Sequence, residues 1–264
     1  MNVLITGASG GLGRAFVNEC VKREDTVIAT DINQHGLVGI QQGVEHRFGK
    51  QIYTYPCDIT SPASMNSFMN YLLEKSLKVD MLLNVAGLDY EGSFMKRDFC
   101  ETNNIIQLNI LGTLRMTYEI LSTRDKTKPF YIINVSSLAA EQPIPLKATY
   151  AASKRFLLDF SYALAEEMKR EKVHVLALCP GGLATKDSVI KAIKAQGFFG
   201  KITTCHMETM VHRTINQALK GKRKYIPGFF NKFTTFFGKF LPIPLITKIL
   251  YKRWFFAQST WLDQ

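Results

Sequence analysis

The chain has 264 residues, 46% of them apolar and 21% charged, with a net charge of +11. This is ordinary globular composition, and a chain of this length can bury most of its apolar surface in one large unit, so we expect a single domain. The five dispersed cysteines lack C-x-x-C spacing, which argues against a disulfide framework and for reduced thiols in a cytoplasmic protein. We expect neither a signal peptide nor a membrane span, since no charge-free apolar run approaches about 18 residues.

Short apolar runs alternate with stretches of helical periodicity along most of the chain. The runs show little polar alternation, as is typical of strands buried on both faces of a parallel sheet. The expected strands are 2–6, 26–30, 51–55, 80–87, 130–137 and 173–181, and the expected helices are 12–23, 34–48, 62–76, 98–123, 148–170 and 207–220. The repeated order predicts an α/β fold with a doubly wound, Rossmann-type parallel sheet.

The first expected strand runs into the glycine-rich sequence TGASGGLG, residues 6–13. Gly7, Gly11 and Gly13 follow the spacing G-x-x-x-G-x-G. Glycines allow the backbone to turn tightly and to approach a pyrophosphate at a helix N-terminus. The alternative is a tight turn with no ligand. An apolar strand before the loop and a helix after it favour the dinucleotide site.

Asp31 ends the second expected strand, 18 residues after Gly13. Dinucleotide-binding folds place an acidic residue near this spacing, where it binds the adenosine ribose 2′-hydroxyl. A carboxylate would repel a 2′-phosphate, so Asp31 favours NAD(H) over NADP(H), although a nearby cation such as Arg14 could alter that preference. The alternative is a solvated acid in a turn.

The sequence YAASK, residues 150–154, places Tyr150 and Lys154 four positions apart on an expected helix. Both side chains therefore lie on one helix face. A free tyrosine has a pKa near 10, and a neighbouring ammonium group is expected to lower it. Tyr150 could then exchange a proton with a ketone or an alcohol. The alternative is an aromatic–cation pair on an exposed helix.

Seven elements occur in the order and spacing of one known family. They are TGASGGLG (6–13), CDIT (57–60), NVAG (84–87), Asn109, NVSS (134–137), YAASK (150–154) and PGGLAT (180–185). Over about residues 1–226 the chain resembles the short-chain dehydrogenase/reductase family. One departure is Val85, where the family more often has Asn or Ala. The resemblance implies an oxidoreductase that interconverts a secondary alcohol and a ketone, with Tyr150 transferring the proton.

The resemblance also assigns roles to individual residues. Ser137 would position the substrate oxygen, and Asn109 would sustain a water-linked proton relay to Lys154, which also holds the ribose. Asp58 would contact the adenine, and Thr185 would hold the nicotinamide carboxamide. The other implied cofactor-binding residues, besides the three glycines, Asp31, Tyr150 and Lys154, are Ser9, Leu12, Ile32, Ile59, Asn84, Ala86, Gly87, Pro180 and Gly181.

The remaining expectations concern a metal site, the alternative to an enzyme, and the oligomeric state. The five histidines share no metal-ligand spacing, so we expect no metal site. The alternative to an enzyme is a non-catalytic redox sensor or scaffold that binds the dinucleotide, and the intact Ser/Tyr/Lys set argues against it. The family commonly forms homodimers or homotetramers, which the resemblance therefore implies here.

Residues 186–206 would form the substrate lid by resemblance. Their apolar side chains favour a hydrophobic substrate, either hydroxysteroid-like or fatty-acyl-like, which would place the protein in lipid metabolism. The same side chains could instead pack the lid onto the body of the domain. We place the catalytic domain at 1–226 and an amphipathic helical tail at 227–264.

The tail is aromatic and basic. Six phenylalanines recur at helical spacing over an arc of about 120°, with Asn231, Thr235 and Gly238 opposite; they are Phe229, Phe230, Phe233, Phe236, Phe237 and Phe240. Between Glu208 and Asp263 there is no acidic residue, whereas the stretch holds ten cations: Arg213, Lys220, Lys222, Arg223, Lys224, Lys232, Lys239, Lys248, Lys252 and Arg253.

This pattern leaves two interpretations open for the tail. Aromatic faces flanked by cations are typical of an interfacial helix, which predicts binding to anionic vesicles through residues 228–256. Alternatively, the phenylalanines pack the tail on the catalytic body or across a dimer. We expect no nucleic-acid partner, since a duplex-binding surface would be largely polar.

Overall fold

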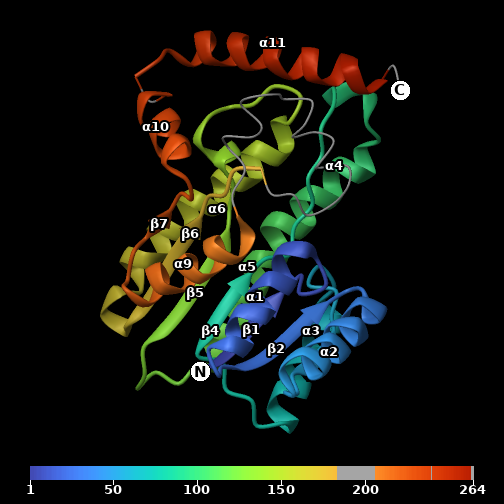
Figure 1. Cartoon of the computed structure of the whole chain (residues 1–264), viewed down its shortest axis with the longest axis vertical. Coiled ribbons are helices and arrows are strands. Elements are labelled where there is room, and N and C mark those ends of the chain that lie inside the picture. The colour runs from blue at the N-terminus through green and yellow to red at the C-terminus, as the bar shows by residue number, and fades with distance from the viewer. Residues whose placement is uncertain (183–205, 239, 263–264) are drawn as a thin grey trace.

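The computed structural model describes residues 1–182, 206–238 and 240–262, apart from the side chains of Trp254 and of residues 256–262. Within these ranges the strands form one parallel seven-stranded sheet in the order β3-β2-β1-β4-β5-β6-β7 (Figure 1). The strands are β1 (Asn2–Thr6), β2 (Thr26–Asp31), β3 (Tyr53–Pro56), β4 (Met81–Asn84), β5 (Phe130–Val135), β6 (Val173–Leu178) and β7 (Lys224–Tyr225).

Helices connect the strands and cover both faces of the sheet. They are α1 (Gly11–Lys22), α2 (Gln34–Phe48), α3 (Pro62–Glu74), α4 (Phe99–Ile106), α5 (Thr113–Thr123), α6 (Ala148–Glu167), α9 (Met207–Leu219), α10 (Phe229–Gly238) and α11 (Ile243–Leu262). A π-helical segment, Gln107–Gly112, joins α4 to α5, and a 3-10 turn, Leu138–Glu141, follows β5.

Alternate side chains of β1 enter two separate cores, as the pleat of a buried strand requires. Val3 and Ile5 pack with α1, α2 and α9 on one face of the sheet. Leu4 packs with α3 and α5 on the other face. All three side chains are fully buried, so the sheet holds the loops at its carboxyl edge on a rigid support.

The order of strands reverses between β1 and β4, and the carboxyl ends of both strands open on the same edge of the sheet. In open α/β sheets this switch point is where ligands bind. The predicted doubly wound fold is confirmed, and six of the expected strands and six of the expected helical stretches have counterparts in the structure. The structure adds β7, and it divides the expected helix 98–123 at the π-helical segment.

α11 lies across the end of the molecule opposite the N-terminus, and α10 leads up to it along one side (Figure 1). Among the described residues, no helix combines the length and the apolarity that a membrane crossing requires. α10 rests on the turn after β5: a Cβ added at Gly238 would lie 3.0 Å from Gln142 Nε2. The tail therefore touches the body at the edge where the strands end.

Candidate active site

The glycine-rich loop leaves no room for side chains on the side that faces the sheet. Gly7 has a φ of +63°, and a Cβ added there would lie 2.7 Å from the backbone of Ala86. A Cβ at Gly13 would lie 2.2 Å from the Gly7 carbonyl oxygen. The loop is therefore compact and opens at the N-terminus of α1, where backbone N–H groups favour a phosphate. These features fit the pyrophosphate of a dinucleotide.

Asp31 fixes the same loop through its carboxylate. The Ser9 N–H donates to Oδ2 and the Asn33 N–H donates to Oδ1, both at 2.9 Å. The side chain lines the cleft described below, at the end of β2. Arg14 is exposed, and its Nε donates to the Ser9 carbonyl oxygen at 2.8 Å. Its guanidinium is thus held against the loop backbone, while the carboxylate faces the cleft.

A second group of residues shapes the floor between β1 and β4. Thr6 Oγ1 accepts from the N–H groups of Val85 and Ala86 at 3.0 and 3.1 Å, which joins the end of β1 to the loop after β4. Asp58 Oδ1 accepts from the N–H and the hydroxyl of Thr60 at 2.9 and 2.6 Å. Hydrogen bonds within the protein thus hold the loop after β3 and the loop after β4 in place.

These loops border one large cleft of about 1530 Å³. The predicted residues that line it are Gly7, Ser9, Gly11, Leu12, Gly13, Asp31, Ile32, Asp58, Ile59, Ala86, Gly87, Ser137, Tyr150, Lys154, Pro180 and Gly181. The tail contributes the opposite wall with Phe230, Leu241, Ile246, Ile249, Leu250 and Arg253. The cleft can thus hold a dinucleotide along the sheet edge and leave apolar space beneath the tail.

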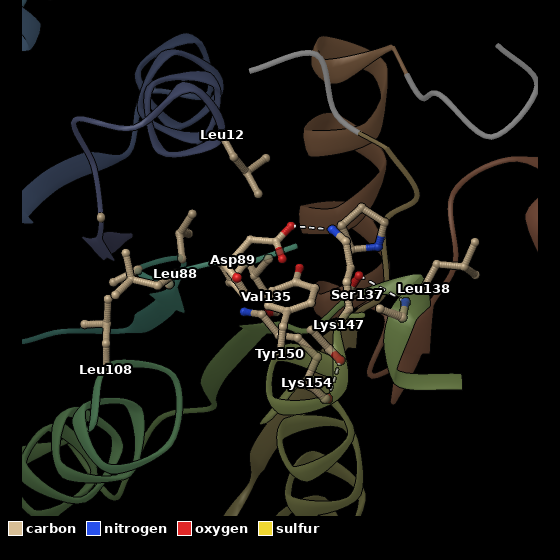
Figure 2. A pocket seen from close by; sticks show the side chains of 18 of the residues that line it. Leu12, Leu88, Asp89, Leu108, Val135, Ser137, Leu138, Lys147, Tyr150 and Lys154 are labelled. Carbon is tan, nitrogen blue, oxygen red and sulfur yellow. Dashed lines mark hydrogen bonds and ion pairs between the residues drawn. The ribbon is translucent and has the colours of Figure 1, made fainter. Parts of the chain in front are cut away.

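Tyr150 stands in this cleft with its hydroxyl hydrogen-bonded to Ser137, and Figure 2 shows the two side chains beside Asp89. Burial raises the pKa of Tyr150 well above its usual value, the Asp89 carboxylate raises it further, and the hydrogen bond from Ser137 lowers it in part. The expected lowering of the Tyr150 pKa is wrong, because desolvation by burial is the largest effect on it and raises it. At neutral pH Tyr150 is a protonated phenol.

Ser137 is held in place by the turn that follows β5. Its Oγ accepts from the Ala139 N–H at 3.1 Å, as an N-cap residue does. This contact occupies the hydroxyl as an acceptor and leaves its proton available for donation. Ser136, its neighbour, points the other way and donates from Oγ to the Lys154 carbonyl oxygen at 2.7 Å, tying α6 to β5.

Lys154 is nearly fully buried, and its Nζ donates to the Val135 carbonyl oxygen at 2.9 Å. Burial lowers the pKa of Lys154 to about 8, and Asp89 opposes this shift. Its Nζ lies 5.8 Å from the centre of the Tyr150 ring. The pair therefore faces the same part of the cleft, with the ammonium behind the ring.

Asn109 sits in the π-helical segment and is completely buried. Its Oδ1 accepts from the Leu88 N–H at 2.8 Å, and its Nδ2 donates to the Leu88 carbonyl oxygen at 2.9 Å and to Ser153 Oγ at 3.0 Å. The π-turn aims this amide inward at the loop after β4. Asn109 does not line the cleft wall, yet a Cβ added at Gly87 would touch both its Oδ1, at 3.2 Å, and Lys154 Nζ, at 3.1 Å.

Asp89 was not predicted and is the most prominent addition to the site. It lines the cleft and accepts from Lys147 Nζ at 2.9 Å (Figure 2). Lys147 Nζ also lies 3.8 Å from Glu91 Oε1. The Lys147 ammonium is 5.3 Å from the centre of the Tyr150 ring. The sequence signal was available, since Asp89 follows the NVAG element by two residues, but its partner comes from a distant loop.

Among the predicted cofactor residues that the structure describes, Asn84 does not line the cleft. Asn84 is buried within the sheet, where its Nδ2 donates to Asn134 Oδ1 at 2.8 Å and to Thr117 Oγ1 at 3.0 Å. It therefore joins β4 to β5 and α5 instead of lining the cleft wall. Thr185 and nearly all of the expected lid, 186–206, lie outside the described residues. Among the residues that are described, no group of three or more His, Cys, Asp or Glu side chains could hold a metal ion.

The comparison with known families gives a match over most of the chain. The family model described as short chain dehydrogenase matches residues 1–193. This range contains the glycine-rich loop, Asp31, Asn109, Ser137, Tyr150 and Lys154. α10 and α11 lie beyond it.

Curated relatives include several reductases of acyl chains. The chain is similar to the ketoacyl reductase HetN of a Nostoc species, with 28% identity over 199 residues that cover 74% of this chain and 69% of that protein. It is also similar to the 3-oxoacyl-[acyl-carrier-protein] reductase FabG of Salmonella typhimurium, with 30% identity over 182 residues, 69% of this chain and 73% of that one. A very-long-chain 3-oxoacyl-CoA reductase of Bos taurus is 28% identical over 71% of this chain and 61% of its own.

Solved structures share the fold. A 3-ketoacyl-(acyl-carrier-protein) reductase from Brucella melitensis, complexed with NADH, aligns with a TM-score of 0.73 and 22% identity over 85% of this chain and 94% of that one. The actinorhodin polyketide ketoreductase with NADPH aligns with a TM-score of 0.77 and 20% identity over 86% and 95%. The family match, the relatives and the assembled site lead to one conclusion. The chain belongs to the short-chain dehydrogenase/reductase family and is an NAD(P)-dependent oxidoreductase that acts on CH–OH groups.

Proposed function

We propose that the protein uses NAD(H) to reduce the ketone of a hydrophobic 3-oxo fatty-acyl thioester to the secondary alcohol. The observation that carries this proposal is the position of Tyr150 between two parts of one cleft. On one side lies the glycine-rich loop with Asp31, and on the other lies the apolar wall that the tail contributes. The relatives that are named as 3-oxoacyl reductases favour an acyl chain over a hydroxysteroid.

The preference for NAD(H) rests on Asp31. Its carboxylate lines the cleft at the end of β2 and accepts hydrogen bonds from two backbone N–H groups. A 2′-phosphate placed beside it would meet a negative charge, whereas a 2′-hydroxyl could donate a hydrogen bond. When bound, the reduced nicotinamide supplies the hydride that the ketone carbon accepts.

The side chains of the protein supply the proton and the orientation. Tyr150 donates its hydroxyl proton to the ketone oxygen as the carbon–oxygen double bond becomes a single bond. Ser137 donates a hydrogen bond to the same oxygen and so fixes its position. Lys154 places a positive charge behind the Tyr150 ring at neutral pH, which eases the negative charge that develops on the phenol oxygen. Because its pKa is raised, Tyr150 stays protonated until the substrate oxygen accepts the proton.

A substrate panel distinguishes the two hydrophobic classes. We expect 3-oxoacyl thioesters to be reduced with a kcat/KM that rises with chain length, because each buried methylene adds about 0.8 kcal/mol of binding. A 3-ketosteroid tested under the same conditions should be reduced slowly. Equal or faster steroid reduction would overturn the acyl assignment and leave the oxidoreductase assignment intact.

A further inference from the structure

α10 is oriented with its polar side toward the protein. Asn231 is completely buried and Thr235 nearly so, and Asn231 Nδ2 donates to the Pro227 carbonyl oxygen at 2.8 Å. On the other side five phenylalanines are 49–86% exposed: Phe229, Phe233, Phe236, Phe237 and Phe240. Of the two open interpretations, packing on the catalytic body is therefore wrong for these five side chains, while packing across a dimer stays a prediction. Phe230, the sixth, lines the cleft.

Exposed rings lie against one another on α10 and just after it, and a second exposed ring pair lies on α11. Phe236 lies against Phe237 and Phe240 at centroid distances of 5.4 and 5.3 Å, in edge-to-face geometry. On α11, Tyr251 and Phe255 are about half exposed and stack at 5.7 Å. Ile246 of α11 is buried on the opposite side. Exposed apolar side chains clustered in this way mark an interaction site.

Cations flank these rings. Lys232 of α10 and Lys248 and Lys252 of α11 are exposed. The sequence from 209 to 262 contains no aspartate or glutamate, so Asp263 is the one acidic side chain in the tail sequence. The surface therefore suits a partner that is both apolar and negatively charged.

We propose that α10 and α11 dock this surface on an anionic lipid bilayer. The rings would enter the interfacial region, where aromatic side chains are favoured, and the lysines would meet the lipid phosphates. Each lysine near an anionic leaflet adds attraction that weakens with salt. Side chains of the same two helices line the cleft, so docking would bring the cleft close to the lipid.

A second copy of the chain is a poorer occupant of this surface. A two-fold interface places the same patch on both sides, so lysines of one copy would face lysines of the other, and residues 209–262 contain no acid to offset them. The phosphates of a nucleic acid would pair with the lysines, but the five exposed phenylalanines would have no apolar partner.

The test uses the whole chain and vesicles of stated composition. We would measure co-sedimentation with phosphatidylcholine vesicles that contain phosphatidylglycerol, and with pure phosphatidylcholine vesicles. We expect binding to the anionic vesicles that weakens as salt rises, and much weaker binding to the neutral ones. Deletion of the tail is a poor variant because α10 and α11 also line the cleft.

Point substitutions separate apolar from electrostatic contributions. Phe236→Ser with Phe240→Ser should weaken binding to anionic vesicles at least tenfold, whereas the exposed Leu73→Ser with Tyr118→Ser should leave it unchanged. Lys248→Gln with Lys252→Gln should weaken it about fivefold or more, and Lys22→Gln with Lys75→Gln should not. NADH binding, measured by fluorescence, checks that each variant is folded.

Three results would overturn the proposal. The first is no binding of the native protein to anionic vesicles. The second is equal loss in the tail variants and their controls. The third is a dimer, seen by light scattering, that Phe236→Ser with Phe240→Ser dissociates while vesicle binding stays unchanged, which would assign the surface to a second copy. None of these outcomes depends on turnover, so they leave the proposed reaction untouched.

Discussion

The Lys154 ammonium lies 5.8 Å from the centre of the Tyr150 ring, and burial shifts the pKa values of the two groups in opposite directions. The pKa of the phenol rises and that of the ammonium falls to about 8. The pair is therefore a protonated acid backed by a cation that titrates near physiological pH. This state suits proton donation to a ketone.

Replacing the proton donor should remove most of the activity. Tyr150→Phe keeps the ring and loses the hydroxyl, so we expect kcat for ketone reduction to fall by about 10²–10⁴. Tyr162→Phe on the same helix is the matched control and should keep full activity. Steady-state rates at saturating NADH measure both. Retention of more than a tenth of the native kcat in Tyr150→Phe would remove Tyr150 from the proposed mechanism.

The pKa of Lys154 makes a prediction about stability and pH. An unfolded lysine has a pKa near 10.4, so between about pH 8 and pH 10 the unfolded chain binds more protons at this site than the folded chain. The free energy of unfolding should therefore rise, by about 2 kcal/mol between pH 7 and pH 9.5 from this group alone. Denaturant unfolding at both pH values measures it.

Lys154→Met provides the control for that prediction. The variant lacks the titrating group, so its free energy of unfolding should gain less than that of the native protein over the same pH interval. A pH dependence identical to the native one would show that Lys154 is not the group responsible. The variant should also lose ketone reduction, since no cation then lies behind Tyr150.

Asp31 should set the cofactor preference. Asp31→Asn removes the negative charge with little change in shape, so the ratio of kcat/KM for NADH to that for NADPH should fall at least tenfold. Asp98→Asn is a matched control, since Asp98 also accepts from a backbone N–H, that of Cys100 at 2.9 Å, but on α4. A native protein that prefers NADPH would contradict the role given to Asp31.

A side chain at Gly87 would crowd the ends of the Lys154 and Asn109 side chains. A methyl group there would lie 3.1 Å from Lys154 Nζ and 3.2 Å from Asn109 Oδ1, so Gly87→Ala should displace the lysine and lower kcat. Gly43→Ala on α2 meets no atom within 4 Å and should instead raise the free energy of unfolding by about 0.5–1 kcal/mol. A native kcat in Gly87→Ala would show that the added methyl group does not displace Lys154.

Much of this site could be predicted because the strands are continuous apolar runs and the motifs follow them at fixed spacings. Asn109 falls in the middle of the expected helix 98–123, where asparagine is disfavoured. The π-helical segment explains its position there. β7 was missed because two residues carry no periodic signal; it forms only through pairing of Lys224 with Ala177 and of Tyr225 with Leu178.

The parts that could not be predicted depend on contacts between distant segments. Asp89 accepts a hydrogen bond from Lys147, which lies 58 residues away along the chain. The amphipathic pattern of α10 showed two faces but not which one meets the body. On the buried face the Asn231 amide donates locally to the Pro227 carbonyl oxygen, while the contact between distant segments is the close approach of Gly238 to Gln142.

The most direct test of the proposed reaction is the loss of NADH absorbance when the purified chain is mixed with a medium-chain 3-oxoacyl thioester. The account predicts NADH oxidation matched by formation of the 3-hydroxyacyl thioester, faster than with NADPH and abolished by Tyr150→Phe. Tight NADH binding with no turnover of any 3-oxoacyl thioester or other ketone would contradict it and favour a redox sensor on the same fold.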